Sequence, residues 1–241
     1  MKLCVAGTGR VGRALASVAS ARGDVVVVWG PDAATIAAWV ESGLAARTTV
    51  FPQDEVADCE LLVIDGDLEF LGRTLRTYCP GLPTDAVVVE TAQPKNDAIR
   101  AVANTDGVAV AGSISAVSEG RWLVDVPDSL HELLRHSGIE CLHVPARHHD
   151  LWRAATELAP ALVAAALAET RDDLASICPE LSVPNTRLAE MTRPLPDAAA
   201  ILADRQAALT VLPRVISVLT DTLRWLEFQE TERLRALLDK P

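Results

Sequence analysis

Short apolar runs, rich in β-branched residues, recur along the chain as far as Val144. They are Lys2–Ala6, Asp24–Trp29, Leu61–Ile64, Ala86–Glu90, Val108–Ala111 and Glu140–Val144. Continuous apolar runs of this length are typical of strands that are buried on both faces, as in a parallel sheet. Helical patterns lie between them, at Arg10–Arg22, Asp32–Ser42 (with Asp32 as a possible N-cap) and Ser129–His136. This alternation predicts a doubly wound α/β domain.

The second half of the sequence has a different character, because no further strand is predicted from about His149 onward. Two long apolar-periodic helices are expected, His149–Asp172 and Ala198–Phe228, each bent by an internal proline, Pro160 or Pro213. Two helices of this length carry more apolar surface than a small domain can bury. The sequence therefore predicts a dinucleotide-binding-type α/β domain at 1–146 and an all-α domain at 147–241 that forms a homodimer.

Composition excludes several classes of protein. Hydrophobic residues make up 49% of the 241 residues and charged residues 23%, which is typical of a globular protein. The formal net charge of −11 disfavours nucleic-acid binding. No apolar run reaches the ~20 residues that cross a bilayer, and Met1–Val5 does not begin a secretory signal. Five scattered cysteines without a CxxC pair favour neither a zinc site nor disulfides, so a cytoplasmic location is expected.

The sharpest motif is the glycine-rich segment Val5–Gly12, which directly follows a predicted strand and opens a predicted helix. In a dinucleotide-binding loop Gly7 permits the tight turn, Gly9 lets the backbone approach a pyrophosphate, and Gly12 lets the helix pack on the strand. The predicted cofactor residues of the loop are Gly7, Thr8, Gly9, Arg10, Val11 and Gly12. The alternative is a purely structural turn. The predicted cofactor is NAD or NADP.

The end of the second predicted strand departs from the usual pattern. An acidic residue commonly holds the ribose hydroxyls there, but Trp29 and Gly30 occupy the place and Asp32 comes late. Loss of the acid removes repulsion against a 2′-phosphate, and Arg10 or Arg13 is a candidate to bind one. Trp29 either stacks on adenine or covers the sheet edge. The choice between NAD and NADP stays open.

The order of several segments resembles the prephenate and arogenate dehydrogenase family. The segments are Gly7–Gly12, Val87–Lys95 (family D-x-G-S-x-K), Val110–Gly120 (family G-H-P-x-A-G…E…G), His148–Asp150, Glu157–Leu167 and Thr186–Ala189 (family T-R-I-A). The resemblance implies an N-terminal Rossmann domain and a helical dimerisation domain. It also implies hydride transfer from a small cyclohexadienyl carboxylate to NAD(P), in aromatic amino acid biosynthesis.

The chain departs from this family at its chemical groups. Ser113 stands where the family has its catalytic histidine, Gln93 replaces a serine, and Glu157, Pro160 and Ala161 cover the region of a second histidine pair. Arg187 is kept, and in the family this arginine pairs with a substrate carboxylate. We therefore expect little activity as an ordinary prephenate dehydrogenase.

Four of the candidate site residues have two interpretations each. Ser113 is either a substrate contact at the catalytic position or a loop residue, and Arg187 either binds the substrate or forms a structural ion pair. Asp65 and Asp67 either bind ribose hydroxyls or a cationic substrate, or are solvated turn acids. Gln93 is a candidate for the nicotinamide amide, Lys95 is expected as a surface charge at a helix start, and His149 as a staple at the domain junction.

Two functions of different classes follow. The first is an NAD(P)-dependent oxidoreductase of the prephenate dehydrogenase type with a changed small-molecule substrate. The second is a catalytically silent homologue that binds a nucleotide or a small carboxylate. A β-hydroxyacid dehydrogenase is disfavoured, because that family has a lysine on the first long helix of its second domain and Leu151–Thr170 contains none.

Overall fold

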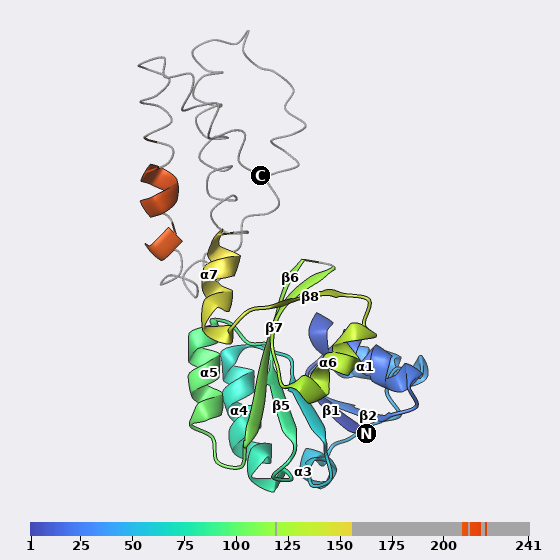
Figure 1. The fold of residues 1–241 in the computed structure, drawn as a ribbon. Coiled ribbons are helices and arrows are strands. Elements are labelled where there is room, and N and C mark those ends of the chain that lie inside the picture. Colours follow the sequence, from blue (N-terminus) through green and yellow to red (C-terminus); the bar gives the residue numbers. More distant parts are fainter. Residues whose placement is uncertain (119, 156–208, 212, 218–219, 221–241) are drawn as a thin grey trace, which may run out of the picture. The chain divides into compact units, whose positions relative to one another are not determined.

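The computed structural model describes residues 1–118, 120–155, 209–211, 213–217 and 220 (Figure 1). The chain divides into two compact units, Met1–Asp150 and Leu151–Pro241. The boundary expected from the sequence, after residue 146, stays a prediction. The first unit carries the sheet and is described first.

An eight-stranded sheet forms the centre of the first unit (Figure 1). The strands are β1 Lys2–Ala6, β2 Val25–Trp29, β3 Arg47–Thr48, β4 Leu61–Ile64, β5 Val87–Glu90, β6 Val110–Ser118, β7 Arg121–Asp125 and β8 Glu140–His143. Their order is β3-β2-β1-β4-β5-β6-β7-β8, and all neighbours are parallel except β6 and β7. The chain order reverses at β1, which pairs with both β2 and β4. Ligands of open α/β sheets bind outside the carboxyl ends of the strands at such a reversal.

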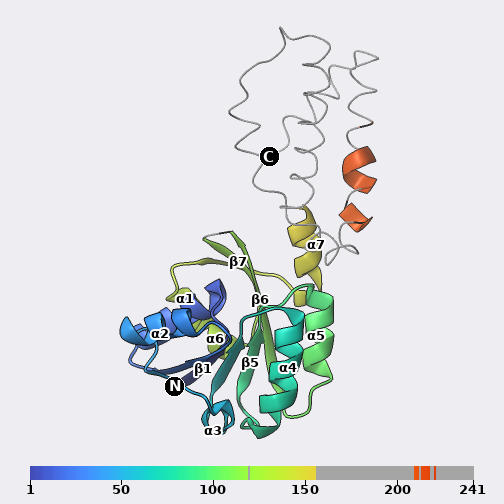
Figure 2. The same ribbon diagram turned by 180° about the vertical axis from the view of Figure 1, so that it is seen from behind.

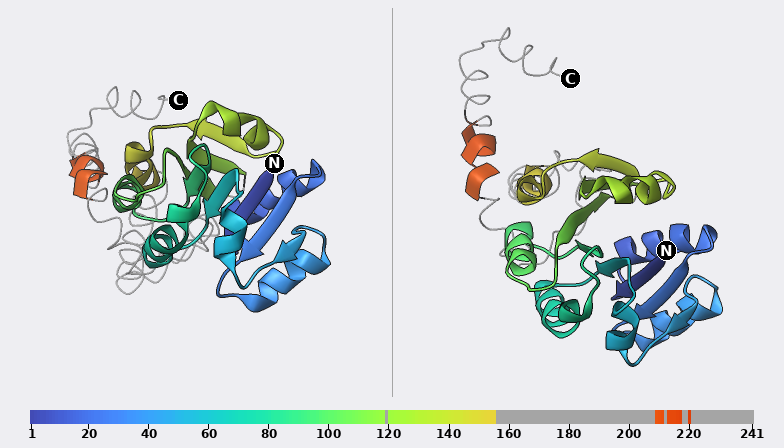
Figure 3. Two further views of the ribbon diagram at one scale, coloured as in Figure 1. Left: turned by 90° about the horizontal axis from the view of Figure 1, so that it is seen from below. Right: turned by 60° about the horizontal axis from the view of Figure 1, so that its bottom comes forward.

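Helices cover both faces of the sheet (Figures 2 and 3). These helices are α1 Arg10–Ala21, α2 Ala33–Glu41, α3 Pro52–Val56, α4 Leu68–Tyr78, α5 Lys95–Ala103 and α6 Asp128–Arg135, with short 3-10 turns at Cys79–Gly81 and Ala146–His148. Helix α7, His149–Arg153, follows at the boundary of the two units. Apolar residues of α1, α2 and α6 share one core cluster, and those of α3, α4 and α5 share the other. The first unit is thus the expected doubly wound α/β fold.

The alternating residues of β1 show how the two cores are divided. Leu3 and Val5 belong to the cluster under α1, whereas Cys4 and Ala6 belong to the cluster under α4 and α5. All four side chains are fully buried. A strand that must be apolar on both faces appears in the sequence as a continuous apolar run, and this explains why the runs identified the parallel strands.

The predicted strands are confirmed, with two additions. β3 is only two residues long and both are exposed, so it has no apolar signal. β7 has the sequence RWLVD and pairs antiparallel with β6. β6 itself extends beyond the predicted end at Ala111 to Ser118. The sequence does not predict this extension, because Ser113 and Ser115 alternate with the buried Ile114. This polar–apolar alternation does not resemble the continuous runs of the other strands.

Helices α4 and α5 are additions to the helices predicted from the sequence, although Leu68, Leu71 and Leu75 of α4 follow a helical spacing. α4 buries only Leu71, Thr74 and Leu75, and α5 buries Lys95, Ala98 and Val102. A threonine and a lysine therefore take places that an apolar residue usually fills. By contrast, Asp32 caps α2 as predicted, because its side chain accepts a hydrogen bond from the Thr35 N–H at 3.0 Å.

The described residues of the second unit are helical. They include the end of α7 and residues 209–211, 213–217 and 220, within the predicted helix Ala198–Phe228. Arg187, the Pro160 bend and most of the predicted dimer surface lie outside the described residues. The homodimer stays a prediction. In the part of the chain that is described, no helix is both long and apolar enough to span a bilayer.

Candidate functional site

The glycine loop joins β1 to α1 at the reversal of strand order, as predicted. Gly7 has φ +102°, a left-handed backbone region that favours glycine, and its N–H donates to the Trp29 carbonyl at 2.8 Å. A Cβ at Gly12 would lie 2.8 Å from Val5 Cγ1, so this glycine allows α1 to pack closely on β1. Gly9 is the N-cap residue of α1 and makes no side-chain cap of its own. Such a helix start attracts an anion.

The Asp65 carboxylate lies against this helix start. Its Oδ2 accepts a hydrogen bond from the Gly12 N–H at 2.6 Å, and its Oδ1 accepts one from the Thr91 hydroxyl at 2.7 Å. A Cβ built at Gly9 would lie 2.4 Å from Asp65 Oδ1. The side chain is therefore an internal cap of α1. Its two internal partners distinguish it from a solvated turn acid, and its predicted contact with ribose hydroxyls or a cationic substrate stays a prediction.

Asp67, the second acid of this turn, has a different position. It is the N-cap residue of α4, and its side chain accepts a hydrogen bond from the Phe70 N–H at 2.7 Å. The residue is exposed. Its geometry is that of an ordinary helix cap.

A pocket of about 660 Å³ lies at the carboxyl end of β2, beside α2 and α4. Its lining residues are Trp29, Gly30, Pro31, Ala33, Ile36, Ala37, Thr48, Thr49, Val50, Pro52, Phe70, Arg73, Thr74 and Tyr78. Among these described residues Arg73 alone is charged, and its guanidinium carbon lies 5.9 Å from the centre of the Phe70 ring. Trp29 is largely buried and meets the Tyr78 ring edge-on, with 5.8 Å between ring centroids. Sequence reasoning missed Arg73, because it comes from a helix far along the chain from β2.

Asp32 does not replace the missing acid of this pocket. Its carboxylate accepts hydrogen bonds from the Thr35 N–H at 3.0 Å and from the Thr35 hydroxyl at 2.6 Å. These hydrogen bonds lower the pKa of Asp32 from its usual value. Its place at the start of α2 is accounted for by capping.

A buried ion pair joins the ends of β5, β6 and α5. Lys95 Nζ lies 3.0 Å from both carboxylate oxygens of Glu90 and donates to the Ile114 carbonyl at 2.9 Å. Lys95 is fully buried, so the expected surface charge was wrong. Burial raises the pKa of Glu90, and Lys95 and the Ser113 hydroxyl oppose that shift.

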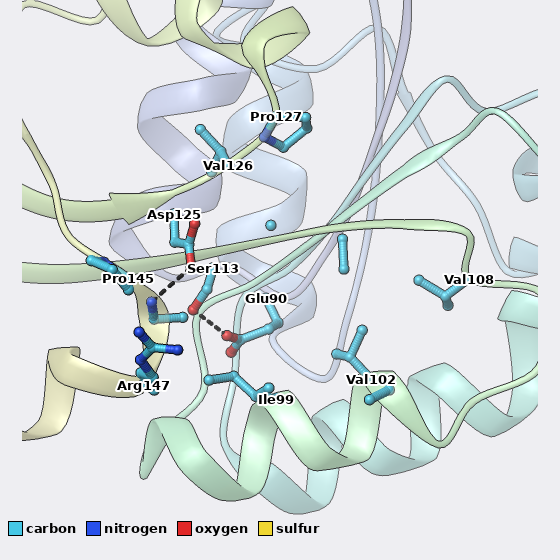
Figure 4. A pocket seen from close by; sticks show the side chains of 14 residues that line it. Glu90, Ile99, Val102, Val108, Ser113, Asp125, Val126, Pro127, Pro145 and Arg147 are labelled. Carbon is cyan, nitrogen blue, oxygen red and sulfur yellow. Dashed lines mark hydrogen bonds between the residues drawn. The ribbon is translucent and has the colours of Figure 1, made fainter.

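Ser113 is a third member of this cluster. Its hydroxyl donates to Glu90 Oε1 at 2.5 Å, and the residue is 5% exposed. It lines a pocket of about 560 Å³, shown in Figure 4 with Glu90, Asp125 and Arg147. No described residue of the glycine loop or of the β2 pocket lines this second pocket. The structure therefore does not place the predicted catalytic Ser113 and the glycine loop in one cavity.

A second hydrogen-bonded chain contains Gln93 and His149. Gln93 Nε2 donates to Ser115 Oγ at 2.9 Å, and Ser115 Oγ lies 3.1 Å from His149 Nδ1. His149 Nε2 lies 2.8 Å from the Val144 carbonyl, which only accepts, so Nε2 carries the proton and Nδ1 accepts from Ser115. Burial lowers the pKa of His149 to about 4, so the ring is neutral near pH 7. His149 thus acts as a staple, and the Gln93 amide nitrogen is already engaged.

Asp150 completes the anchoring of this corner. Its Oδ1 accepts a hydrogen bond from the Lys95 N–H at 2.8 Å, and its Oδ2 from the Asn96 N–H at 3.3 Å. The carboxylate therefore caps α5 from a distant part of the sequence. The described residues contain no group of three or more His, Cys, Asp or Glu side chains placed to hold a metal ion.

We expect Lys95→Met to destabilise the first unit strongly, because it leaves the Glu90 charge buried without its cation. Breaking a buried ion pair costs about 3–5 kcal/mol. Urea unfolding measures this loss of free energy. The exposed pair Arg121–Glu140 supplies the control, since Arg121→Met should cost less than about 1 kcal/mol. Equal losses in the two variants would show that the Lys95 pair is not a structural element.

Solved structures with the same architecture include several dehydrogenases. Arogenate dehydrogenase from Synechocystis superposes with a TM-score of 0.80 at 17% identity, covering 99% of this chain and 96% of that one. Prephenate dehydrogenase from A. aeolicus, in complex with hydroxyphenyl propionate and NAD+, gives 0.74 at 12% identity, covering 99% and 94%. 3-Hydroxyisobutyrate dehydrogenase from Mycobacterium tuberculosis gives 0.63 at 12% identity, covering 89% and 87%.

Sequence comparison adds no relative to this set. No family model matches the chain, and no curated protein sequence matches it. At 12–17% identity the structural likeness establishes the fold. The first unit and its neighbours therefore share the Rossmann-like architecture that the sequence resemblance implied, and the chain has the fold of the prephenate and arogenate dehydrogenases.

Proposed function

We propose that this protein is an NAD(P)-dependent oxidoreductase of the prephenate dehydrogenase type, with a small carboxylate-bearing substrate. The observation that carries this proposal is the glycine loop at the reversal of strand order, next to the aromatic pocket at the end of β2. A nicotinamide dinucleotide, when bound, supplies the acceptor or donor of a hydride. The neighbours of like fold, one of them an NAD+ complex, support the same reading.

The described residues fit the nucleoside part of such a cofactor. The glycine loop has no side chains of its own at Gly7, Gly9 and Gly12 beside the helix start. The β2 pocket offers aromatic rings together with the threonine hydroxyls of Thr48 and Thr49. One group does not fit the diphosphate, namely the Asp65 carboxylate at Gly9. We propose that the loop residues Gly7–Gly12, with Trp29 and Gly30, bind the nucleotide.

We further propose a preference for NADP over NAD. Gly30 stands where an acid would repel a 2′-phosphate, and Arg73 supplies a cation in the same pocket. Arginine binds phosphate through two parallel hydrogen bonds. The exposed Arg10 and Arg13 lie on α1, whereas Arg73 lines the pocket itself, which favours Arg73 for this role.

The first test is direct binding. Titration calorimetry of the wild-type chain with NADH and NADPH should give saturable binding, and Gly9→Val should abolish it, because the added side chain fills the space at the loop. Gly120→Ala is the matched control, since a Cβ there meets nothing within 4 Å. Thermal unfolding of each variant checks that it is folded. Identical titrations of wild type and Gly9→Val would refute the assignment of the loop.

The second test concerns nucleotide preference. We expect Arg73→Ala to weaken NADPH binding about tenfold or more while NADH binding changes little, because a lost charge-assisted hydrogen bond is worth about 1.5–3 kcal/mol. The control is Arg76→Ala. Arg76 lies three residues further along α4, is also exposed and does not line the pocket. Equal effects on NADH and NADPH would assign Arg73 to packing alone.

The substrate side of the proposal depends on Arg187, which lies outside the described residues. We propose that its guanidinium binds a substrate carboxylate, as the family resemblance implies. Ser113 is proposed as a substrate contact only, because a hydroxyl that donates to Glu90 is not poised to take a proton from a substrate.

A catalytically silent homologue is the second candidate, and a specific observation favours it. The Ser113 hydroxyl, at the family's catalytic position in this chain, already donates its hydrogen bond to Glu90. Such a protein would bind a nucleotide or a small carboxylate without turning it over.

Turnover assays separate the two candidates. With prephenate or arogenate and NAD(P), we expect a rate reduced by roughly 10²–10⁴-fold from the usual range, because general acid–base help is missing. With a better substrate found by screening, Arg187→Ala should raise KM about tenfold or more and leave the Kd for NADPH unchanged. A rate for prephenate of about 1–10³ per second would contradict the expectation, and an unaffected KM would remove Arg187 from the site.

A further inference from the structure

We propose that the Asp65 carboxylate is an internal competitor for the diphosphate position of the nucleotide site. It occupies the start of α1, and a dinucleotide binds only after displacing it or against its charge. This inference rests on the proposed nucleotide site and adds a residue that sets the strength and selectivity of binding there.

The position of the carboxylate is fixed by donors from two separate elements. The Gly12 N–H belongs to the first turn of α1, and the Thr91 hydroxyl follows β5. The Asp65 N–H donates to the Ala6 carbonyl at 2.8 Å, which holds the backbone of the turn against the end of β1. The side chain therefore points into the loop because both its backbone and its two oxygens are held.

The space it fills is the space that a dinucleotide needs. The second glycine of such a loop lacks a side chain so that the pyrophosphate can approach the backbone. A side chain at Gly9 would project directly into the Asp65 carboxyl group. Its Oδ1, Oδ2 and Cγ atoms all lie within 2.5 Å of the position that a Gly9 Cβ would take. No side chain of the loop itself fills this space, but the Asp65 side chain, from the turn between β4 and α4, does.

Charge makes the competition stronger than a steric overlap alone. A helix start stabilises one negative group through its free N–H groups and its positive partial charge. Asp65 already uses this attraction. A diphosphate placed beside it would meet a like charge, whereas an adenosine group in the β2 pocket, which Asp65 does not line, would not.

The inference predicts different behaviour for two classes of ligand. Ligands with a diphosphate, such as ADP and NADPH, should be weakened by Asp65, and adenosine 2′-phosphate, which has no diphosphate, should be insensitive to it. Titration calorimetry of the full chain with these three compounds measures the effect without any turnover. The variant is Asp65→Asn, which keeps the size of the side chain and removes its charge.

We expect ADP and NADPH to bind Asp65→Asn at least about tenfold more tightly than the wild type, with adenosine 2′-phosphate unchanged. Glu69→Gln is the matched control, because it removes one exposed charge from the first turn of α4 and should leave all three affinities unchanged. Thermal unfolding confirms that each protein is folded. Asp65→Ser, a smaller neutral side chain that still accepts a hydrogen bond, repeats the test if the asparagine variant does not fold.

The outcomes separate this inference from the proposed function. If the wild type binds NADPH and Asp65→Asn binds it equally, the competition does not exist and the nucleotide site stands. If only Asp65→Asn binds NADPH, the inference is supported and the natural chain is not a dinucleotide enzyme under those conditions. Equal gains for adenosine 2′-phosphate would overturn the inference, since they would reflect a general change of the pocket. If neither the wild type nor Asp65→Asn binds ADP or NADPH, the inference is overturned as well.

Discussion

The pairing of β1 with β2 on one edge and β4 on the other is the constraint from which the rest of the first unit follows. The pairing covers both edges of β1, and the helices on the two sides of the sheet bury both of its faces, so Leu3–Ala6 are apolar. Gly7 makes the turn after β1 with a left-handed backbone. The same pairing brings the turn after β4 against the loop after β1, which is why Asp65 reaches the start of α1.

The sequence was informative where one physical requirement dominated a segment. Burial on both faces produced the apolar runs of β1, β2, β4 and β5, and the need for a tight turn and close packing produced the glycines. It was uninformative where the requirement depended on a distant partner. Lys95 has the sequence context of an ordinary helix start, and only the position of Glu90 at the end of β5 makes it a buried cation.

The candidate site shows the same limit. The loop and its helix were readable from local sequence, but the role of an acid depends on which donors face it in the fold. Asp65 and Asp67 are two residues apart and of one type, yet one meets the Gly12 amide and Thr91 and the other caps its own helix. Arg73 reaches the β2 pocket from α4, so the sequence around β2 does not predict its presence there. Residues 156–208, which include Arg187, lie outside the described residues.

Several polar groups near the expected ligand positions have a hydrogen-bond partner inside the protein. Asp65 is bonded to Gly12 and Thr91, Ser113 to Glu90, and the Gln93 amide nitrogen to Ser115. A ligand that replaces such a bond gains only the difference between two hydrogen bonds. The aromatic rings of the β2 pocket and Arg73 are not held by the hydrogen bonds of this group. Since a buried group stripped of its partner is costly, ligands that leave these internal bonds intact are favoured over those that break them. The chain thus combines the Rossmann-like fold of its structural neighbours with side chains that bond one another at the ends of the strands.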